Sequence, residues 1–379
     1  MPSSNLLPLS RITLSIDSET AEAVAEVERK IWLFSHQLNS RSELAAKAFY
    51  DSCLHVESIA NIKMTGKQTS ARDVFRAAAT KPSEIGKNGE KHKQESLRNI
   101  DALLAACSVG KRRVTVDSFY EIHRQLLTGT TREPYRGVLR AQNQKTGGGR
   151  YQSFGMSHEA PRPEDIPDLL ADLAAFCNQT TIPAVAQAAL AHVQFLAIHP
   201  FERANGKTAR SLVQLVLQHR QLIDRKIPPL SLALALSPHE YREGVIATMK
   251  NLERETPNPA ELNAWVQFFA TCCARSIEEA ETLRNRLSTL LADCHARVGA
   301  RSDSASTMII DALPGMPVFS TNMMSSYIER SFKRVSVALD ELVTASVVKQ
   351  ITEGKRNRVF ECPAVVDAYA HIPGFQQLQ

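Results

Sequence analysis

The sequence predicts a mostly helical protein, and three observations support this fold class. Apolar residues recur at intervals of three and four over 20–62 and again over about 96–300, which is the spacing of amphipathic helices. Residues 132–167 interrupt the second run with three consecutive glycines and several prolines, which exclude a helix and predict a β-hairpin or extended loop. A different pattern begins near residue 301. The expected fold is an all-α core with a β-hairpin and a small C-terminal domain.

Three regions are expected along the chain: a helical N-terminal region (1–95), a helical core (96–300) and the C-terminal domain (301–379). The N-terminal region ends in a polar, lysine-rich stretch at 80–94, which is typical of a solvated loop. Helix resumes after the glycine-rich gap at Pro163, where acidic residues suit the positive end of a helix dipole.

The C-terminal domain has the element order of a winged helix-turn-helix. The stretch "STNMMSSYIERSFKRVSVALDELV" predicts two helices with a break near Ser331, and "VVKQIT" and "RVFEC" predict two strands. DNA contacts are expected from five basic residues, which are Lys333, Arg334, Lys355, Arg356 and Arg358. The domain holds as many acidic as basic residues, so docking of a protein or dimerisation remains an alternative.

Composition excludes several classes of protein. The 379 residues, 43% of them hydrophobic and 22% charged, can bury a large core without disulfides. The net charge of +5 permits a phosphate-bearing partner without requiring one. Seven cysteines without a C-x-x-C pair favour free buried thiols over disulfides or a zinc site. No run reaches the ~18 apolar residues of a membrane span, so a cytoplasmic protein of bacterial type without a membrane partner is expected.

The stretch "AIHPFERANGKTAR", residues 197–210, has the pattern of an anion-binding site. A helix is expected to end at His199, because the following proline disfavours helical geometry at the residue before it. A second helix follows "PFERANG", so this link is a tight loop that leads into a helix N-terminus. Backbone amides and the helix dipole together attract anions at such a terminus.

Side chains in the same stretch suit a polyphosphate. Backbone amides around Asn205 and Gly206 are expected to point into the loop, while Lys207 and Arg210 share one face of the first helical turn. His199 lies at the rim, where a neutral imidazole could take a proton from a hydroxyl. Taken singly, these residues also suit a helix cap and surface charges; their combination predicts a functional site.

This stretch resembles the motif of the Fic (filamentation induced by cAMP) family, His-Pro-Phe-x-acid-Gly-Asn-Gly-Arg-x-x-Arg. The matching positions are His199, Pro200, Phe201, Asn205, Gly206 and Arg210, with Lys207 in place of the first arginine. "PYRGVLRAQNQ", "APRPEDIPDLLADL" and "SPHEYREGVIATM" resemble further segments of the family, so the resemblance covers most of the chain.

The resemblance implies transfer of AMP from ATP to a Tyr, Ser or Thr hydroxyl of a target protein. It implies that His199 is the base, that loop amides including those of Asn205 and Gly206 hold the phosphates, and that Lys207 and Arg210 contact them. It also implies a flap, roughly Asn143 to Pro161, to which the target adds as a strand.

Two positions of the loop depart from the family motif. Arg203 stands where the family has an acid that ligates Mg²⁺, which reverses the charge. Two alternatives are open there: Glu202 holds the metal, or Arg203 neutralises phosphate directly. Ala204 replaces a glycine, as in members that transfer phosphate or phosphocholine. Three functions therefore remain: AMP transfer, transfer from another donor, and a catalytically impaired nucleotide-binding or DNA-binding regulator.

The family's self-inhibitory helix also has a degenerate counterpart. The aligned piece is "NIKMTG", in which Asn61 replaces a Ser or Thr, Thr65 replaces the inhibitory glutamate and Gly66 matches. The resemblance therefore implies that this restraint is missing. A second copy of the chain is a further candidate partner, which would make a homodimer.

Other candidates outside the motif are expected to be structural. His192 lies two helical turns before the motif histidine and is expected to be hydrogen-bonded within the helix packing. Trp265, Phe268 and Phe269 recur at helical spacing, which is typical of a core rather than of a nucleotide platform. The resemblance also allows Tyr241 to be a self-modified hydroxyl, since family members often label themselves, although no neighbouring residue singles it out.

Overall fold

A computed structural model describes residues 6–36, 42–66, 70–79, 87–143, 145–146, 158–224, 228–353, 357–372 and 375, with only the backbone described for 87–93, 145–146 and 158. The chain forms two compact units. Unit 1 comprises Met1–His36 and Arg98–Ile277, and unit 2 comprises Gln37–Leu97 and Glu278–Gln379. The expected division into three regions remains a prediction.

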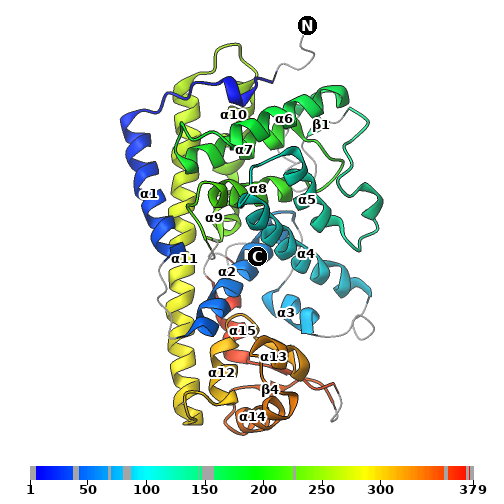
Figure 1. The fold of residues 1–379 in the computed structure, drawn as a ribbon, viewed down its shortest axis with the longest axis vertical. Helices are drawn as coiled ribbons and strands as arrows, with labels where there is room; N and C mark the ends of the chain where they lie inside the picture. The colour runs from blue at the N-terminus through cyan, green and yellow to red at the C-terminus, as the bar shows by residue number, and fades with distance from the viewer. Residues whose placement is uncertain are drawn as a thin grey trace. The chain divides into compact units, whose positions relative to one another are not determined.

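Unit 1 is helical, as the apolar spacing predicts (Figure 1). Its helices are α1 (Ser18–His36), α5 (Val116–Leu127), α6 (Ile166–Cys177), α7 (Ala184–Ile198), α8 (Asn205–His219), α9 (Leu230–Leu236) and α10 (Pro238–Leu252). Short 3-10 turns occur at η1 (Leu9–Arg11), η3 (Glu133–Tyr135) and η5 (Pro163–Asp165). Two long helices, α4 (Lys87–Gly110) and α11 (Pro259–Val298), contribute residues to both units.

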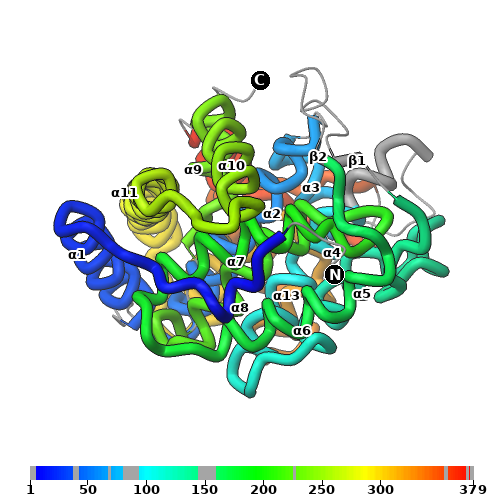
Figure 2. Tube along the Cα trace, turned by 90° about the horizontal axis from the view of Figure 1, so that it is seen from above, coloured from blue at the N-terminus to red at the C-terminus, as the bar shows by residue number. Residues whose placement is uncertain are grey.

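Helix α7 is the centre of unit 1. Every residue of α7 except Leu196 is buried, which is expected of a helix that is apolar on all sides. It packs against α6, α8 and α10, and Figure 2 shows it between α6 and α10. The site residues at the end of α7 are therefore attached to a helix that is buried over almost its whole length.

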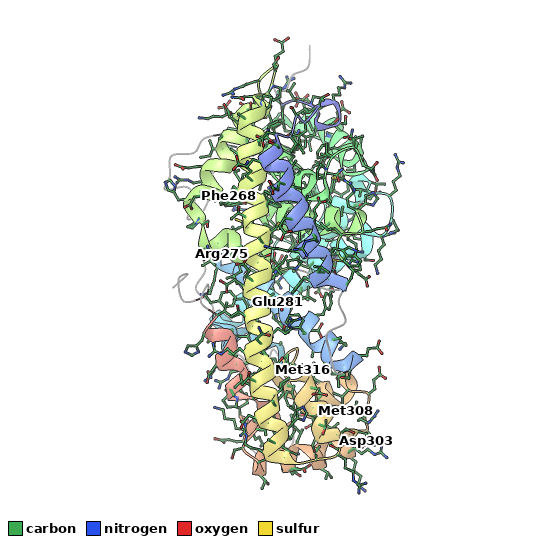
Figure 3. The ribbon with its side chains drawn as sticks, turned by 90° about the vertical axis from the view of Figure 1, so that its left-hand side faces the viewer. Phe268, Arg275, Glu281, Asp303, Met308 and Met316 are labelled. Carbon is green, nitrogen blue, oxygen red and sulfur yellow. The ribbon has the colours of Figure 1, made fainter. Side chains whose placement is uncertain are left out.

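The first half of α11 closes the core of unit 1. Trp265 and Phe269 are buried, and Trp265 Nε1 donates a hydrogen bond of 2.9 Å to the Ala189 carbonyl of α7. Phe268 is half-buried. The expectation that this aromatic set belongs to the core is confirmed. Figure 3 shows α1 beside this part of α11, where Gln267 donates to Thr20.

A pair of short strands marks the expected hairpin. Strand β1 (Lys145–Thr146) pairs antiparallel with β2 (His158–Glu159). The whole segment between them, 147–157, lies outside the described residues, and so does residue 144. The flap from Asn143 to Pro161 is thus described only at its two arms.

Unit 2 combines helices with a small sheet. Its elements are α2 (Glu43–Lys63), α3 (Ala71–Ala79), α12 (Ala305–Ala312), β3 (Val318–Ser320), α13 (Thr321–Tyr327), α14 (Phe332–Thr344), β4 (Lys349–Gln350), β5 (Val359–Glu361) and α15 (Pro363–Ala370). The strands run antiparallel in the order β3-β5-β4. The two helices expected after residue 320 are α13 and α14, and the two expected strands are β4 and β5. Strand β3 is an additional strand that was not expected. At three residues, β3 is too short to show an alternating pattern.

A buried carboxylate joins parts of unit 2 that are distant in sequence. Glu361 of β5 is fully buried and forms ion pairs with Arg76 (2.7 Å), Arg72 (3.8 Å) and Lys349 (3.5 Å). These cations lower the pKa of Glu361 against the opposing effect of burial. Removing a single partner from such a buried cluster is costly, so the contact favours one arrangement of α3 on the sheet.

All seven cysteines are free and buried, which confirms the expectation drawn from their number and spacing. Burial raises the pKa of the Cys107 and Cys362 thiols to about 12, so both remain protonated and unreactive at neutral pH. Among the described residues, no helix has the length and apolar character needed to cross a membrane.

Candidate functional site

The motif loop, residues 199–206, begins with a strained turn at the end of α7. His199 caps the helix with φ 47° and ψ 57°, and its N–H donates to the Phe195 carbonyl at 3.0 Å. Histidine is among the few non-glycine residues enriched in this left-handed region. Pro200 follows and cannot continue the helix. The histidine is half-buried at the point where the chain leaves the core.

Asn205 locks the loop from within. Its Oδ1 accepts a hydrogen bond from the Phe201 N–H at 3.0 Å, and its Nδ2 donates to the Phe201 carbonyl at 2.6 Å. Both side chains are buried. Since the side chain of Asn205 is occupied in this way, its contribution to anion binding would come from its backbone N–H. Phe201 is fully buried and anchors the loop in the core.

Ala204 keeps a backbone conformation that suits glycine. It is the N-cap residue of α8 with φ 62° and ψ 11°, and its carbonyl accepts bonds from both the N–H (2.9 Å) and the hydroxyl (3.0 Å) of Thr208. A side chain in this region costs roughly 1–2 kcal/mol. The alanine therefore adds strain while the helix still begins at Asn205.

The first turn of α8 gathers positive charge. The guanidinium of Arg210, 7% exposed, lies over the turn, since a Cβ placed at Gly206 would lie 3.4 Å from Arg210 Nη1. Lys207 is half-buried in the same turn. The first N–H groups of an α-helix have no acceptor within the helix, and the macrodipole adds to their positive potential. The geometry suits a phosphate group.

A histidine that the sequence analysis missed holds the loop from outside. The ring of His123 in α5 stacks on Phe201 with a centroid distance of 3.7 Å and an interplanar angle of 6°. Its Nδ1 accepts the Gly137 N–H at 3.0 Å, so the proton is on Nε2, which donates to the Arg203 carbonyl at 3.1 Å. Burial lowers the pKa of His123 to about 4, which keeps the imidazole neutral.

Arg140 is the second residue that the sequence analysis did not identify. It is 2% exposed, and its guanidinium donates to backbone carbonyls, including that of His199 at 2.9 Å. Its neighbour Leu139 forms an antiparallel bridge with Phe201. Nothing in the sequence distinguishes this arginine from those nearby, because its partners at the end of α7 and in the motif loop are about sixty residues away in the chain.

His192 and Tyr241 form a buried pair in the core. His192 Nδ1 donates to the Ala209 carbonyl at 3.0 Å, so its Nε2 accepts the Tyr241 hydroxyl at 2.9 Å. Burial lowers the pKa of His192 to about 4. The structural role expected for His192 is confirmed. The hydroxyl of Tyr241, at 7% residue exposure, donates inside the core and is poorly placed for self-modification.

The loop could hold a magnesium ion only through Glu202, because Arg203 stands at the position implied for the acidic ligand. The side chain at the position implied for the acidic ligand is the exposed Arg203, and the adjacent Glu202 is half-buried. Among the described residues, no group of three or more His, Cys, Asp or Glu side chains could hold a metal. Mg²⁺ at a phosphate site is bound by one or two carboxylates together with the substrate phosphates, and Glu202 is the single carboxylate that the loop offers.

The remaining predicted residues lie outside unit 1. The inhibitory-motif residues form the end of α2, where Asn61 is buried, the Thr65 hydroxyl donates to the Ile62 carbonyl at 2.7 Å and Gly66 adopts φ 79°. A glycine in the left-handed region is a common helix terminator. The "NIKMTG" piece thus has a local structural role as a helix stop.

The predicted DNA-contact residues differ in their surroundings. Lys333 and Arg334 are exposed on α14. Arg358 forms an ion pair of 2.7 Å with Asp340 and a hydrogen bond to Ser336, so it is engaged within its own unit. Lys355 and Arg356 lie outside the described residues.

Fold and site together define a class: a helical protein in which two core helices, α7 and α8, are joined by a loop suited to bind an anion beside a histidine. Residues 113–217, from just before α5 to near the end of α8, match the model of the Fic/DOC family. The chain therefore contains a Fic/DOC family domain.

Known proteins support this assignment at the level of family and fold. The chain is 24% identical over 269 residues to the protein adenylyltransferase Fic of Nematostella vectensis, covering 69% of this chain and 56% of the relative. It is 26% identical over 252 residues to that of Drosophila virilis, covering 64% and 45%. The chain thus spans about half the length of these relatives.

Two solved structures share the fold. A Fic family protein from Desulfovibrio desulfuricans G20 has a TM-score of 0.54 at 14% identity, covering 92% of this chain and 97% of that one. A Fic domain containing signaling protein from Bacteroides thetaiotaomicron VPI-5482 has a TM-score of 0.51 at 17% identity, covering 68% and 95%. At these identities the likeness concerns the fold alone.

Proposed function

We propose that the chain is a Fic-type nucleotidyltransferase that moves AMP from ATP to a Tyr, Ser or Thr hydroxyl of a protein. The observation that carries this proposal is the motif loop, in which His199 and the first turn of α8 are held on one rigid backbone. Such an arrangement places a base and an anion site within reach of the same substrate. The relatives named protein adenylyltransferase support the choice of AMP transfer and of ATP as donor.

The proposed reaction is an in-line displacement at the α-phosphate. The target hydroxyl oxygen forms a bond to the α-phosphorus, His199 takes the hydroxyl proton, and the bond to the β-phosphate bridging oxygen breaks. Pyrophosphate leaves with that electron pair. Backbone amides at the start of α8, with Lys207 and Arg210, would stabilise the phosphate charges, so most of the catalysis would come from positioning and electrostatics.

No step of this mechanism is assigned to a metal held by the protein. A resident Mg²⁺ would supply charge neutralisation between the phosphates. We propose that the exposed Arg203 takes over part of this role by contacting phosphate directly, with Glu202 as the alternative residue for a metal ligand. The flap arms at β1 and β2 would receive the target as an added strand.

A change of donor is the first alternative within the same site. Ala204 would favour phosphate or phosphocholine transfer if its methyl group altered how the donor lies in the loop. The left-handed φ of Ala204 weighs against this alternative, because the loop keeps the backbone conformation of a glycine. Competition by unlabelled phosphocholine-containing nucleotides in the transfer assay would identify that donor.

Transfer is tested with ATP labelled at the α-phosphate, with and without Mg²⁺ or Mn²⁺, on the purified chain and on a cell lysate. Wild type should label protein, and His199→Ala should reduce the rate by ~10³-fold, since general base catalysis and positioning are lost together. The matched control is His239→Ala, a surface histidine of the same unit whose side chain is 64% exposed. Binding of ATP without any transfer to protein would reject the proposal.

A regulator without transfer activity is the second candidate, favoured by the reversed charge at Arg203. In this case the C-terminal part of unit 2, which we propose is a winged helix, would be the working domain. Asp340 and Glu341 share α14 with Lys333 and Arg334, and these acids would repel DNA phosphates. The same acids favour a protein over DNA as the partner of this helix. A steep fall of DNA affinity with salt would instead support DNA binding.

We also propose that the chain lacks self-inhibition of the family type. The glutamate position is Thr65, and its hydroxyl is used for the end of α2. The purified chain should therefore transfer AMP without an activating partner.

A further inference from the structure

Arg140 joins the motif loop through three backbone groups. Its Nε donates to the His199 carbonyl at 2.9 Å, its Nη2 also donates to the Ile198 carbonyl at 3.4 Å, and its own N–H donates to the Pro200 carbonyl at 3.0 Å. The last carbonyls of a helix have no partner within the helix, and the dipole makes this end negative. A cation at this point therefore caps α7 and holds the strained turn at His199.

The same side chain reaches both arms of the flap. Nη1 donates to the Gln142 carbonyl at 2.9 Å, just before the flap, and Nη2 donates to the Pro161 carbonyl at its far end. The planar guanidinium presents its donors in fixed directions, so one side chain fixes three chain segments relative to one another. A lysine at this position could satisfy only part of this set.

The charge of Arg140 has no carboxylate partner among the described residues. Burial lowers the pKa of its guanidinium, yet an arginine remains protonated at neutral pH. Its charge is balanced by carbonyl dipoles alone, which is unusual for a cation that is 2% exposed. The positive charge suits the negative end of α7, and it also adds positive potential beside a loop suited to phosphate.

We propose that Arg140 is a positioning residue that couples the flap to the motif loop. Through Arg140, binding of a polyphosphate at the loop also orders the two flap arms, and the arms in turn hold His199 in its productive orientation. The coupling requires only that the loop binds an anion. The part that concerns the orientation of His199 rests on the proposed transfer function.

Amide hydrogen exchange measures the coupling without any need for transfer. ATP, with pyrophosphate as a second anion, should slow exchange by ~10-fold or more in peptides that contain the loop and in peptides that contain residues 139–143 and 158–162. In Arg140→Lys, ATP should protect the loop peptides only. Arg162→Lys is the matched control, because this arginine adjoins the same arm and is half-exposed.

Two exchange results would overturn the proposal. One is a wild type in which ATP protects the loop while the arm peptides are unaffected, a result that needs no variant and so does not depend on how a variant folds. The other is equal protection of the arms in wild type and in Arg140→Lys. The thermal midpoint of each variant is measured alongside. Arg140→Gln keeps two N–H donors without the charge, whereas Arg140→Lys keeps the charge, so the two variants together separate the charge from the hydrogen bonds.

Transfer kinetics test the orientation of His199. A residue that only positions the base should lower kcat by ~100-fold in Arg140→Lys while KM for ATP changes by less than ~3-fold. A parallel loss of ATP affinity would assign Arg140 to binding and contradict positioning. If wild type itself transfers nothing, the proposed function fails, and the exchange experiment still decides the coupling.

Discussion

The motif loop and helix α14 use the same kinds of residue in opposite ways. At the loop, Arg140 and Arg210 are buried: Arg140 donates to backbone carbonyls of adjoining segments, and Arg210 lies over the first turn of its own helix. On α14, Lys333 and Arg334 are exposed, with acidic residues a turn or two away. The difference indicates that the properties of the loop depend on the exact positions of its buried side chains. Those of α14 depend mainly on how many charged side chains it exposes to solvent.

The largest contrast concerns two phenylalanines. Phe201 is fully buried in the motif loop, and Phe332 at the start of α14 is 55% exposed. Phe201→Ala should lower the free energy of unfolding by about 4 kcal/mol, since it removes a buried ring and leaves a cavity under the loop. Phe332→Ala should cost less than about 0.5 kcal/mol. Urea denaturation curves of the two variants measure both values, and similar losses would contradict the contrast.

The pH dependence of stability in unit 1 should reflect the protonation of two buried histidines, His123 and His192. Burial lowers the pKa of both His123 and His192 to about 4, below the usual 6.5 of the unfolded chain. Between these values the unfolded state binds more protons, so stability is complete above about pH 6.5 and falls as the pH decreases toward 4. Each histidine should contribute roughly 3 kcal/mol to this loss.

Thermal unfolding between pH 4 and 7 measures this fall. The variant His192→Gln should flatten the profile, since glutamine can donate and accept in place of the neutral ring without taking up a proton. His239→Gln is the surface control and should leave the profile unchanged. A wild-type stability that is constant from pH 7 to 4 would show that these rings are not held neutral.

The smallest contrast uses one substitution in two places. Ala204→Gly should stabilise the chain by about 0.5–1 kcal/mol, because glycine adopts the positive φ without strain. Ala338→Gly, inside α14, should destabilise it by about 1 kcal/mol, because glycine is a poor helix former. The two changes are compared by chemical denaturation. Equal signs would mean that the left-handed turn at Ala204 is not strained.

Sequence alone predicted the parts of the site whose contacts are local. The end of α7 at His199 depends on Pro200, its neighbour in the chain, so the local sequence was sufficient to place it. Helix α8 begins at Asn205, two residues before the expected start after Gly206. His123 and Arg140 were missed because their partners are distant in sequence, and no periodicity marks a residue that bonds backbone carbonyls elsewhere.

The same distinction between local and distant contacts holds for the fold. Helices with a clear apolar face, such as α5 and α14, follow from the spacing of three and four. Strand β3 and the ion pairs of Glu361 with Arg72 and Arg76 arise only when distant segments meet, so they could not be predicted from local patterns.

The central claim, that the motif loop is a fixed phosphate site in which Arg203 replaces a metal ligand, is tested most directly by ATP binding. Titration calorimetry of wild type and Arg203→Asp is performed in EDTA and in Mg²⁺. Wild type should bind ATP with a similar Kd in both buffers, whereas Arg203→Asp should need Mg²⁺ and lose at least ~10-fold in affinity in EDTA. Wild-type binding that depends on Mg²⁺ as strongly as that of the variant would contradict the account.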